Sequence, residues 1–206
     1  MAFLVLGARG MIGSRIAAEL ARRGHLVVKA SRSGADDTTP IDANDTTALR
    51  AALTDDIQAL VVAIAPDLSD GAPRVRETFE GIIGVCRSAN KKPVFFVGGA
   101  GSLNMPNNKG RLIDNLPPDF PTFVKQKSEQ HIEALPFLRQ VNDVPWTYLS
   151  PCIKLLPEEP GTGKYKLGKD DIVSVSMSVE DYALAAVDEL ENPKHTYERF
   201  SVGSAD

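Results

Sequence analysis

The sequence has few of the residues that mark secreted, membrane-spanning or nucleic-acid-binding proteins. Its two cysteines, Cys86 and Cys152, lie in apolar surroundings, which indicates a reducing compartment rather than a disulfide framework. No stretch approaches the roughly 18 consecutive apolar residues of a membrane span. The net charge of −4 and the pI of about 5.5 give no general basic face for nucleic acid. We therefore expect a cytoplasmic protein that binds neither a membrane nor nucleic acid.

Histidine is also scarce, and the spacing of the three histidines disfavours a metal site. The three histidines, His25, His131 and His195, are scattered, and none has a histidine partner at helical i,i+4 spacing. We predict no metal. With 43% hydrophobic and 24% charged residues, the chain has an ordinary globular composition. Its 206 residues favour one domain over residues 1–206.

What the sequence does contain is a regular alternation of strand and helix patterns. Short apolar runs alternate with segments whose apolar residues recur at helical spacing. The predicted strands span residues 3–6, 25–31, 59–64, 93–97, 146–149 and 199–202. The predicted helices span residues 12–23, 45–53, 73–88, 123–141 and 178–192, with a bend at Pro136. Repeated strand–helix–strand units predict an α/β fold of the Rossmann type, a doubly wound parallel sheet with helices on both faces.

Two segments interrupt this rhythm. Residues 103–121 are rich in proline, asparagine and glycine and are expected to form a loop. Residues 153–177 mix prolines and glycines with short β-like pieces. We expect this second segment to form a small lid-like excursion over the substrate cleft. The helix after it has Ser178 and Asp181 in the positions of a capping box.

A glycine-rich loop follows the first strand and opens the first helix. Its glycines, Gly7, Gly10 and Gly13, have the spacing GxxGxxG. Gly7 permits the tight turn, Gly10 lets the backbone approach a pyrophosphate, and Gly13 lets the helix pack close to the strand. The N–H groups of Met11 and Ile12 are then expected to face the phosphates. The context predicts a dinucleotide site rather than an ordinary glycine turn.

The end of the second strand favours NADP(H), with NAD(H) as the less favoured cofactor. NAD-preferring sites usually carry an acid about 20 residues beyond the loop, but residues 28–33 contain none. Arg32 can clamp a 2′-phosphate, and Ser31 or Ser33 can donate hydrogen bonds to it. Arg9 can reach the same phosphate or stack on the adenine. The alternative is that both arginines are solvated surface charges.

Further cofactor contacts follow from the fold, because ligands bind at the carboxyl ends of parallel strands. Asp42 and Ala43 are expected to flank the adenine. The remaining predicted contacts lie at the ends of the third, fourth and fifth strands: Ala63, Ile64, Ala65, Gly98, Gly99, Ala100, Pro151, Cys152 and Ile153.

Taken together, these motifs resemble those of the atypical short-chain dehydrogenase/reductases. The branch concerned is the NAD(P)H-binding one, which includes NADH-flavin reductase and biliverdin IXβ/flavin reductase-like proteins. Five segments carry the resemblance, namely 7–13, 96–103, 147–151, 163–168 and 178–183. The resemblance implies an NAD(P)H-dependent oxidoreductase that reduces a small conjugated acceptor, such as a flavin or a quinone-like compound.

The resemblance also implies one catalytic residue. In the biliverdin and flavin reductase-like members a serine after the fourth strand lies beside the nicotinamide, and Ser102 matches that place. Ser102 could orient the acceptor or relay a proton, although a turn-capping role is the alternative. The helix before the fifth strand offers Lys125 and Lys127, whose roles stay open, but no tyrosine. The match Tyr165-x-x-x-Lys169 lies in the excursion, so we reject it as the Tyr-Lys pair of the classical enzymes.

Two alternatives remain open at this point. A non-catalytic NADP(H)-sensing regulator resembling NmrA-like proteins would need no catalytic group. An epimerase or dehydratase would use the cofactor transiently, but the missing Tyr-Lys pair disfavours it. The identity of the acceptor and the oligomeric state are not predicted.

Overall fold

The wholly apolar runs of the sequence form the centre of one large sheet. The structure is a computed structural model that describes residues 1–35 and 37–205. β1 and β6 are buried along their whole length, as expected for parallel strands covered on both faces. The strands are β1 (Ala2–Leu6), β2 (Leu26–Ser31), β3 (Thr39–Pro40), β4 (Ile57–Val62), β5 (Val94–Val97), β6 (Trp146–Ser150), β7 (Lys154–Leu156), β8 (Tyr165–Gly168), β9 (Ser176–Ser178) and β10 (Glu198–Ser204).

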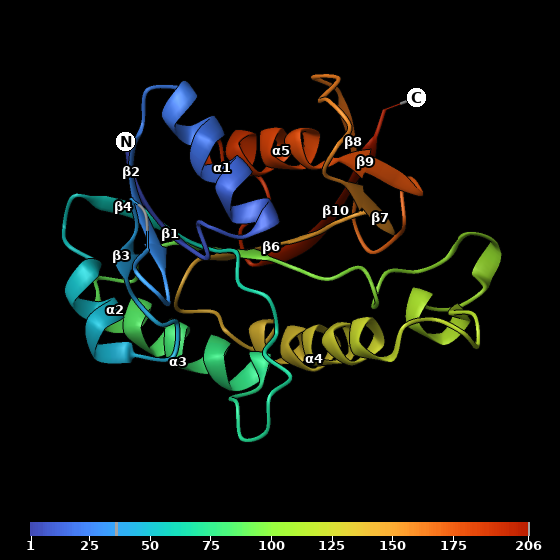
Figure 1. Cartoon of the computed structure of the whole chain (residues 1–206), viewed down its shortest axis with the longest axis horizontal. Helices are drawn as coiled ribbons and strands as arrows, with labels where there is room; N and C mark the ends of the chain where they lie inside the picture. The colour runs from blue at the N-terminus through green and yellow to red at the C-terminus, as the bar shows by residue number, and fades with distance from the viewer. Residues whose placement is uncertain (36, 206) are drawn as a thin grey trace.

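Helices cover both faces of this sheet. They are α1 (Met11–Arg22), α2 (Thr46–Ala52), α3 (Val75–Ser88), α4 (Thr122–Leu138) and α5 (Val179–Glu191), with short 3₁₀ turns η1 (Pro106–Asn108) and η2 (Leu112–Asn115). Figure 1 shows α1 and α5 on one face and α2, α3 and α4 on the other. Each face has its own hydrophobic core, one packed against each set of helices.

The strand order is β3-β2-β1-β4-β5-β6-β10-β8. The pairings from β3 to β10 are parallel, and β8 alone runs antiparallel, beside β10. The order reverses direction between β1 and β4, which is the point where open α/β sheets bind ligands. The predicted Rossmann-type α/β fold is confirmed.

The predicted helices and strands are present, with differences at their ends. α4 ends at Leu138 rather than at residue 141, because the N–H groups of Gln140 and Val141 bond to carbonyls three residues back instead of continuing the α-helical pattern. Pro136 lies inside the last turn of this helix. The segment 153–177, which the sequence predicted as a lid-like excursion, forms strands. Its strand β8 extends the main sheet, and β7 pairs with β9 in a separate two-stranded sheet.

Asp181 ties this segment to α5. The Ser178 Oγ accepts from the Asp181 N–H at 3.0 Å, which is half of the predicted capping box. The Asp181 carboxylate does not complete the box but accepts from the N–H groups of Thr162 at 3.0 Å and Gly163 at 2.9 Å. Burial alone would raise the pKa of Asp181, but these backbone donors outweigh it, so the pKa lies below its usual range. A helix-capping residue therefore also fixes the loop before β8.

A tyrosine–histidine pair joins β5, β6 and α4. The Tyr148 Oη accepts from the Gly99 N–H at 3.0 Å and lies 3.2 Å from the His131 Nδ1. Burial lowers the pKa of His131 to about 4, so the ring is neutral at pH 7, and its tautomer decides which partner donates in this pair. The Tyr148 ring also explains why residue 98 is a glycine, because a Cβ there would lie 2.1 Å from a ring carbon.

None of the described helices combines the length and the apolarity needed to cross a bilayer.

The depressed pKa of His131 predicts a pH-dependent stability. Between the ordinary pKa of 6.5 and the folded-state value of about 4, the unfolded chain binds this proton and the folded chain does not. The free energy of unfolding should therefore fall as the pH is lowered through this window. His131→Asn should lose less stability over the same window, as measured by urea unfolding at several pH values. The two proteins showing the same slope would contradict the assignment to His131.

Candidate functional site

The turn between β1 and α1 is held by contacts that leave no room for a side chain at two of its glycines. Gly7 has a φ of +75°, and a Cβ there would lie 2.2 Å from the carbonyl oxygen of Ala63 at the end of β4. A Cβ on Gly13 would lie 2.2 Å from the carbonyl oxygen of Gly7. The Gly10 N–H closes the turn on that same carbonyl at 2.9 Å. The turn therefore lies directly against β4, at the reversal of strand order.

The amino terminus of α1 offers hydrogen-bond donors at this turn. Gly10 is the N-cap residue, so no side chain caps the helix, and no acid lies in its first turn. The first N–H groups of a helix lack internal partners and attract anions. Met11 and Ile12 open the helix here, as the predicted pyrophosphate contact requires.

A cavity of about 750 Å³ lies beside the turn, between β2, β4 and the start of α3. The predicted binding residues that line it are Gly7, Arg9, Gly10, Ser31, Arg32, Ser33, Asp42, Ala43, Ala63, Ile64 and Ala65. Lining residues that the sequence analysis did not single out are Leu6, Ile41, Asn44, Pro66, Asp67, Ala72, Pro73, Val75 and Thr78. Most of these belong to the loop after β4 and the start of α3, where no motif marks them. The cavity has the size and position for the adenosine half of a dinucleotide.

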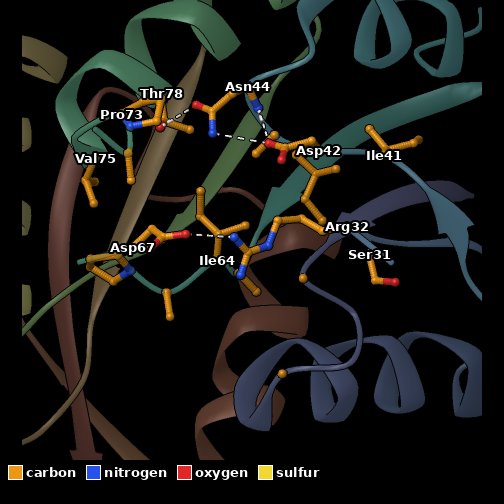
Figure 2. A pocket seen from close by; sticks show the side chains of 18 of the residues that line it. Ser31, Arg32, Ile41, Asp42, Asn44, Ile64, Asp67, Pro73, Val75 and Thr78 are labelled. Carbon is orange, nitrogen blue, oxygen red and sulfur yellow. Dashed lines mark hydrogen bonds and ion pairs between the residues drawn. The ribbon is translucent and has the colours of Figure 1, made fainter. Parts of the chain in front are cut away.

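Two arginines enter this cavity from different elements. The Arg9 Nη1, on the glycine turn, donates to the Ser33 Oγ at 3.0 Å. Arg32, at the end of β2, extends past Ile64 toward Asp67, and its Nη1 lies 2.8 Å from the Asp67 Oδ2 (Figure 2). The predicted phosphate ligand Arg32 is thus paired with a carboxylate on the opposite side of the cavity.

Asp67 is a fixed and fully ionised partner. Its Oδ1 accepts from the hydroxyl and the N–H of Ser69, at 2.5 and 3.0 Å. These hydrogen bonds and the Arg32 guanidinium lower the pKa of Asp67 to about 2. The carboxylate is therefore charged at every pH at which the protein is expected to work.

A polar chain forms another part of the cavity wall (Figure 2). The Asp42 Oδ1 accepts from the Asn44 N–H at 2.8 Å, and the Asn44 Oδ1 accepts from the Thr78 hydroxyl at 2.7 Å. The loop before α2 is thereby joined to α3. Asp42 and Asn44 both line the cavity.

The contacts predicted at the ends of the fourth and fifth strands of the sequence pattern lie outside this cavity. Gly98, Gly99 and Ala100 follow β5, and residues 151–153 follow β6, farther along the same edge of the sheet. Cys152 is buried and its Sγ donates to the Lys154 carbonyl, while burial raises the pKa of its thiol. Cys152 is therefore a packing residue with no sign of an activated thiolate.

Ser102 lies on the turn after β5 and is partly exposed. Its Oγ accepts from the Nη1 of Arg199 on β10, at 3.3 Å. Tyr148, whose hydroxyl accepts from the Gly99 N–H just after β5, is 1% exposed. Tyr165 packs against the core under α1 and α5, and its hydroxyl donates to Asp188 on α5. Lys125 and Lys127 lie on the first turns of α4, and the Lys127 Nζ is 6.0 Å from the centre of the Phe123 ring.

No metal centre accompanies these residues in the structure. Among residues 1–35 and 37–205, no three histidine, cysteine or acidic side chains are grouped so as to hold a metal ion.

Comparison with known proteins places this geometry in a family. A family model described as NAD(P)H-binding matches residues 7–193. The uncharacterized protein YwnB of Bacillus subtilis strain 168 is 33% identical over 210 residues, which cover 97% of each chain. The model match begins at Gly7, the first glycine of the turn.

Two solved structures share the whole fold. A "putative NADH-flavin reductase" from Streptococcus pneumoniae TIGR4 superposes with a TM-score of 0.84, is 28% identical and covers 100% of both chains. A "putative epimerase" from Bacteroides thetaiotaomicron superposes with a TM-score of 0.85, is 29% identical, and the match covers 100% of this chain and 97% of that one. These matches confirm the resemblance that the motifs indicated, and the chain belongs to the NAD(P)H-binding family of Rossmann-type proteins.

Proposed function

We propose that this protein is an NADPH-dependent reductase that passes hydride to a small conjugated acceptor, such as a flavin or a quinone-like compound. The observation that carries the proposal is the cavity at the reversal of strand order, which joins an uncapped helix amino terminus to two arginines. The family supplies the cofactor class. The similarity to the protein named as an NADH-flavin reductase supports the type of acceptor.

The residues present fit a phosphorylated dinucleotide. The amino terminus of α1 would hold the pyrophosphate. Arg9 with Ser33, and Arg32, would hold the 2′-phosphate, since guanidinium groups bind phosphate oxygens in planar pairs. Ser31 lies behind them, buried, with its Oγ 2.7 Å from the Thr38 hydroxyl, so it supports the wall rather than reaching for a ligand.

The chemistry follows from this placement. NADPH, when bound, supplies a hydride, which carries two electrons to the acceptor. Ser102 would then orient the acceptor or donate a hydrogen bond to the negative charge that the hydride leaves on it. A proton from water completes the reduction.

A non-catalytic NADP(H) sensor is the second candidate. It is favoured by the burial of Tyr148, whose hydroxyl binds the turn after β5 and which is only 1% exposed. Such a protein would use the same cavity and the same arginines. Only turnover separates the two candidates.

Turnover is tested by following NADPH absorbance with FMN, a quinone such as menadione, and biliverdin as acceptors. We expect oxidation with at least one of them. We also expect Ser102→Ala to lower kcat by about 10- to 100-fold, the worth of one hydrogen bond to a charged group, while NADPH still binds. Tight NADPH binding without oxidation across the panel would instead support the sensor.

Cofactor preference is tested by direct binding of NADPH and NADH, followed by the fluorescence of the bound cofactor. Arg32→Ala should weaken NADPH binding by about 10- to 100-fold, the worth of a charged hydrogen bond, and leave NADH nearly unchanged. Equal losses for the two cofactors would refute a role of Arg32 at the 2′-phosphate.

Asp67 provides a finer test of the same site. Its carboxylate competes with the phosphate for Arg32, so Asp67→Asn should tighten NADPH binding by about two- to fivefold, because exposed ion pairs are worth at most about 1 kcal/mol. Asp70→Asn, on the same loop but outside the cavity wall, is the matched control and should change neither affinity. Weaker NADPH binding in Asp67→Asn would mean that the carboxylate positions Arg32 instead of competing for it.

A further inference from the structure

Arg199 is a buried cation that the proposed binding site does not use. It lies on β10, with its side chain only 3% exposed. β10 pairs with β6, and Arg199 is opposite Tyr148 in that register. A buried guanidinium is costly unless its donors are satisfied, so its partners indicate what it is for.

The hydrogen-bond partners of the Arg199 guanidinium lie along two of its edges. The Arg199 Nε donates to the Asp170 Oδ1 at 2.7 Å, and its Nη2 makes a second, shorter contact with the same oxygen. The Nη1 donates to two hydroxyls, the Ser102 Oγ at 3.3 Å and the Ser150 Oγ at 3.5 Å. One edge therefore balances the charge, and the other holds two serines.

Only one of these serines can reach a ligand. Ser150 is completely buried, whereas Ser102 is partly exposed on the turn after β5. Arginine can donate hydrogen bonds but cannot accept them. The Ser102 Oγ must therefore be the acceptor toward Arg199, which leaves its own O–H free to donate in another direction.

The turn that carries Ser102 is also held in place by backbone bonds. The Asn104 N–H donates to the Asp170 carbonyl at 2.8 Å, and the Ile172 N–H donates to the Asn104 carbonyl at 3.0 Å. Asp170, the counter-charge of Arg199, thus lies on the segment that fixes the chain two residues after Ser102.

We propose that Arg199 is the positioning residue that makes Ser102 a hydrogen-bond donor toward the acceptor. The inference rests on the proposed reductase function. Hydride addition gives the acceptor two electrons and one proton, oxidises NADPH to NADP⁺, and leaves negative charge on a conjugated oxygen or nitrogen. The Ser102 O–H donates to that atom, the final proton comes from water, and Ser102 keeps its own proton. Arg199 itself touches neither cofactor nor acceptor.

The test compares Arg199→Lys, Ser102→Ala and the double variant. Lysine can keep the charge pair with Asp170, but it has no planar second edge with which to hold Ser102. We expect Arg199→Lys to lower kcat by about 10- to 100-fold, as for the loss of one hydrogen bond to a charged group, with NADPH affinity within about twofold of the unmodified protein. The double variant should be no slower than Ser102→Ala, because both changes remove one interaction.

A second readout does not depend on turnover. Binding of 4-nitrophenol to the complex with NADP⁺ is followed by the absorbance of the yellow phenolate, which imitates the charged acceptor. The unmodified protein should stabilise the phenolate, and Arg199→Lys and Ser102→Ala should lose this signal to a similar extent. Arg139→Gln is the matched control: the Arg139 Nη2 binds the same Asp170 oxygen at 3.1 Å, but Arg139 has no contact with Ser102. It should change neither readout.

The outcomes separate the two proposals. Additive losses in the double variant, a full rate in Arg199→Lys, or an equal phenolate signal in all proteins would overturn the role of Arg199 while leaving the reductase in place. An unmodified protein that oxidises no NADPH would overturn the reductase and this role together. If thermal unfolding shows that Arg199→Lys does not fold, Arg199→Gln takes its place, since it leaves no buried cation and should show the same losses.

Discussion

The close approach of three backbone segments determines the rest of the site. Gly7 presses against the carbonyl of Ala63, and Gly13 presses against the carbonyl of Gly7. The start of α1 is thereby seated at the end of β4, on the line where the strand order reverses. The helix amino terminus, the end of β2 and the loop after β4 then surround one cavity. A methyl group at either glycine would push these segments apart, because the atoms in the way are backbone and cannot turn aside.

The two arginines of the cavity lie on and beside this glycine turn. Arg9 lies on the glycine turn and Arg32 directly follows β2, and each is already held by an oxygen-bearing partner, Ser33 or Asp67. A guanidinium that is held before the ligand arrives loses less conformational freedom on binding. The same arrangement would oppose the proposed binding of a 2′-phosphate, since the Asp67 carboxylate already binds the Arg32 Nη1. In the proposed function, the affinity for NADPH would then reflect a difference between two anions that compete for one cation.

Much of the fold could be predicted from the sequence, because each central strand is a short apolar run and each helix carries an apolar stripe. The cavity wall was predictable where a motif or a strand end marks it, as at Gly7, Ser31 and Ala63. It was not predictable at Asp67 or Thr78, because these residues reach the cavity through the path of a loop. The sequence pattern also did not predict that β8 joins the main sheet, because its pairing with β10 brings together residues far apart in sequence. Arg199 and His131 carry no local pattern at all, and their partners are defined only by packing.

The bonds of Asn104 have a mechanical consequence. Asn104 begins the long arm that contains η1 and η2, and its two backbone bonds fasten that arm to residues 170–172, just after β8. β8 in turn is a strand of the main sheet, and the loop before it is anchored on α5 by Asp181. The arm and the excursion (residues 153–177) are therefore joined to each other at Asn104 and residues 170–172, close in sequence to Ser102. A substitution at this junction would therefore displace the arm, the excursion and the turn that carries Ser102 together.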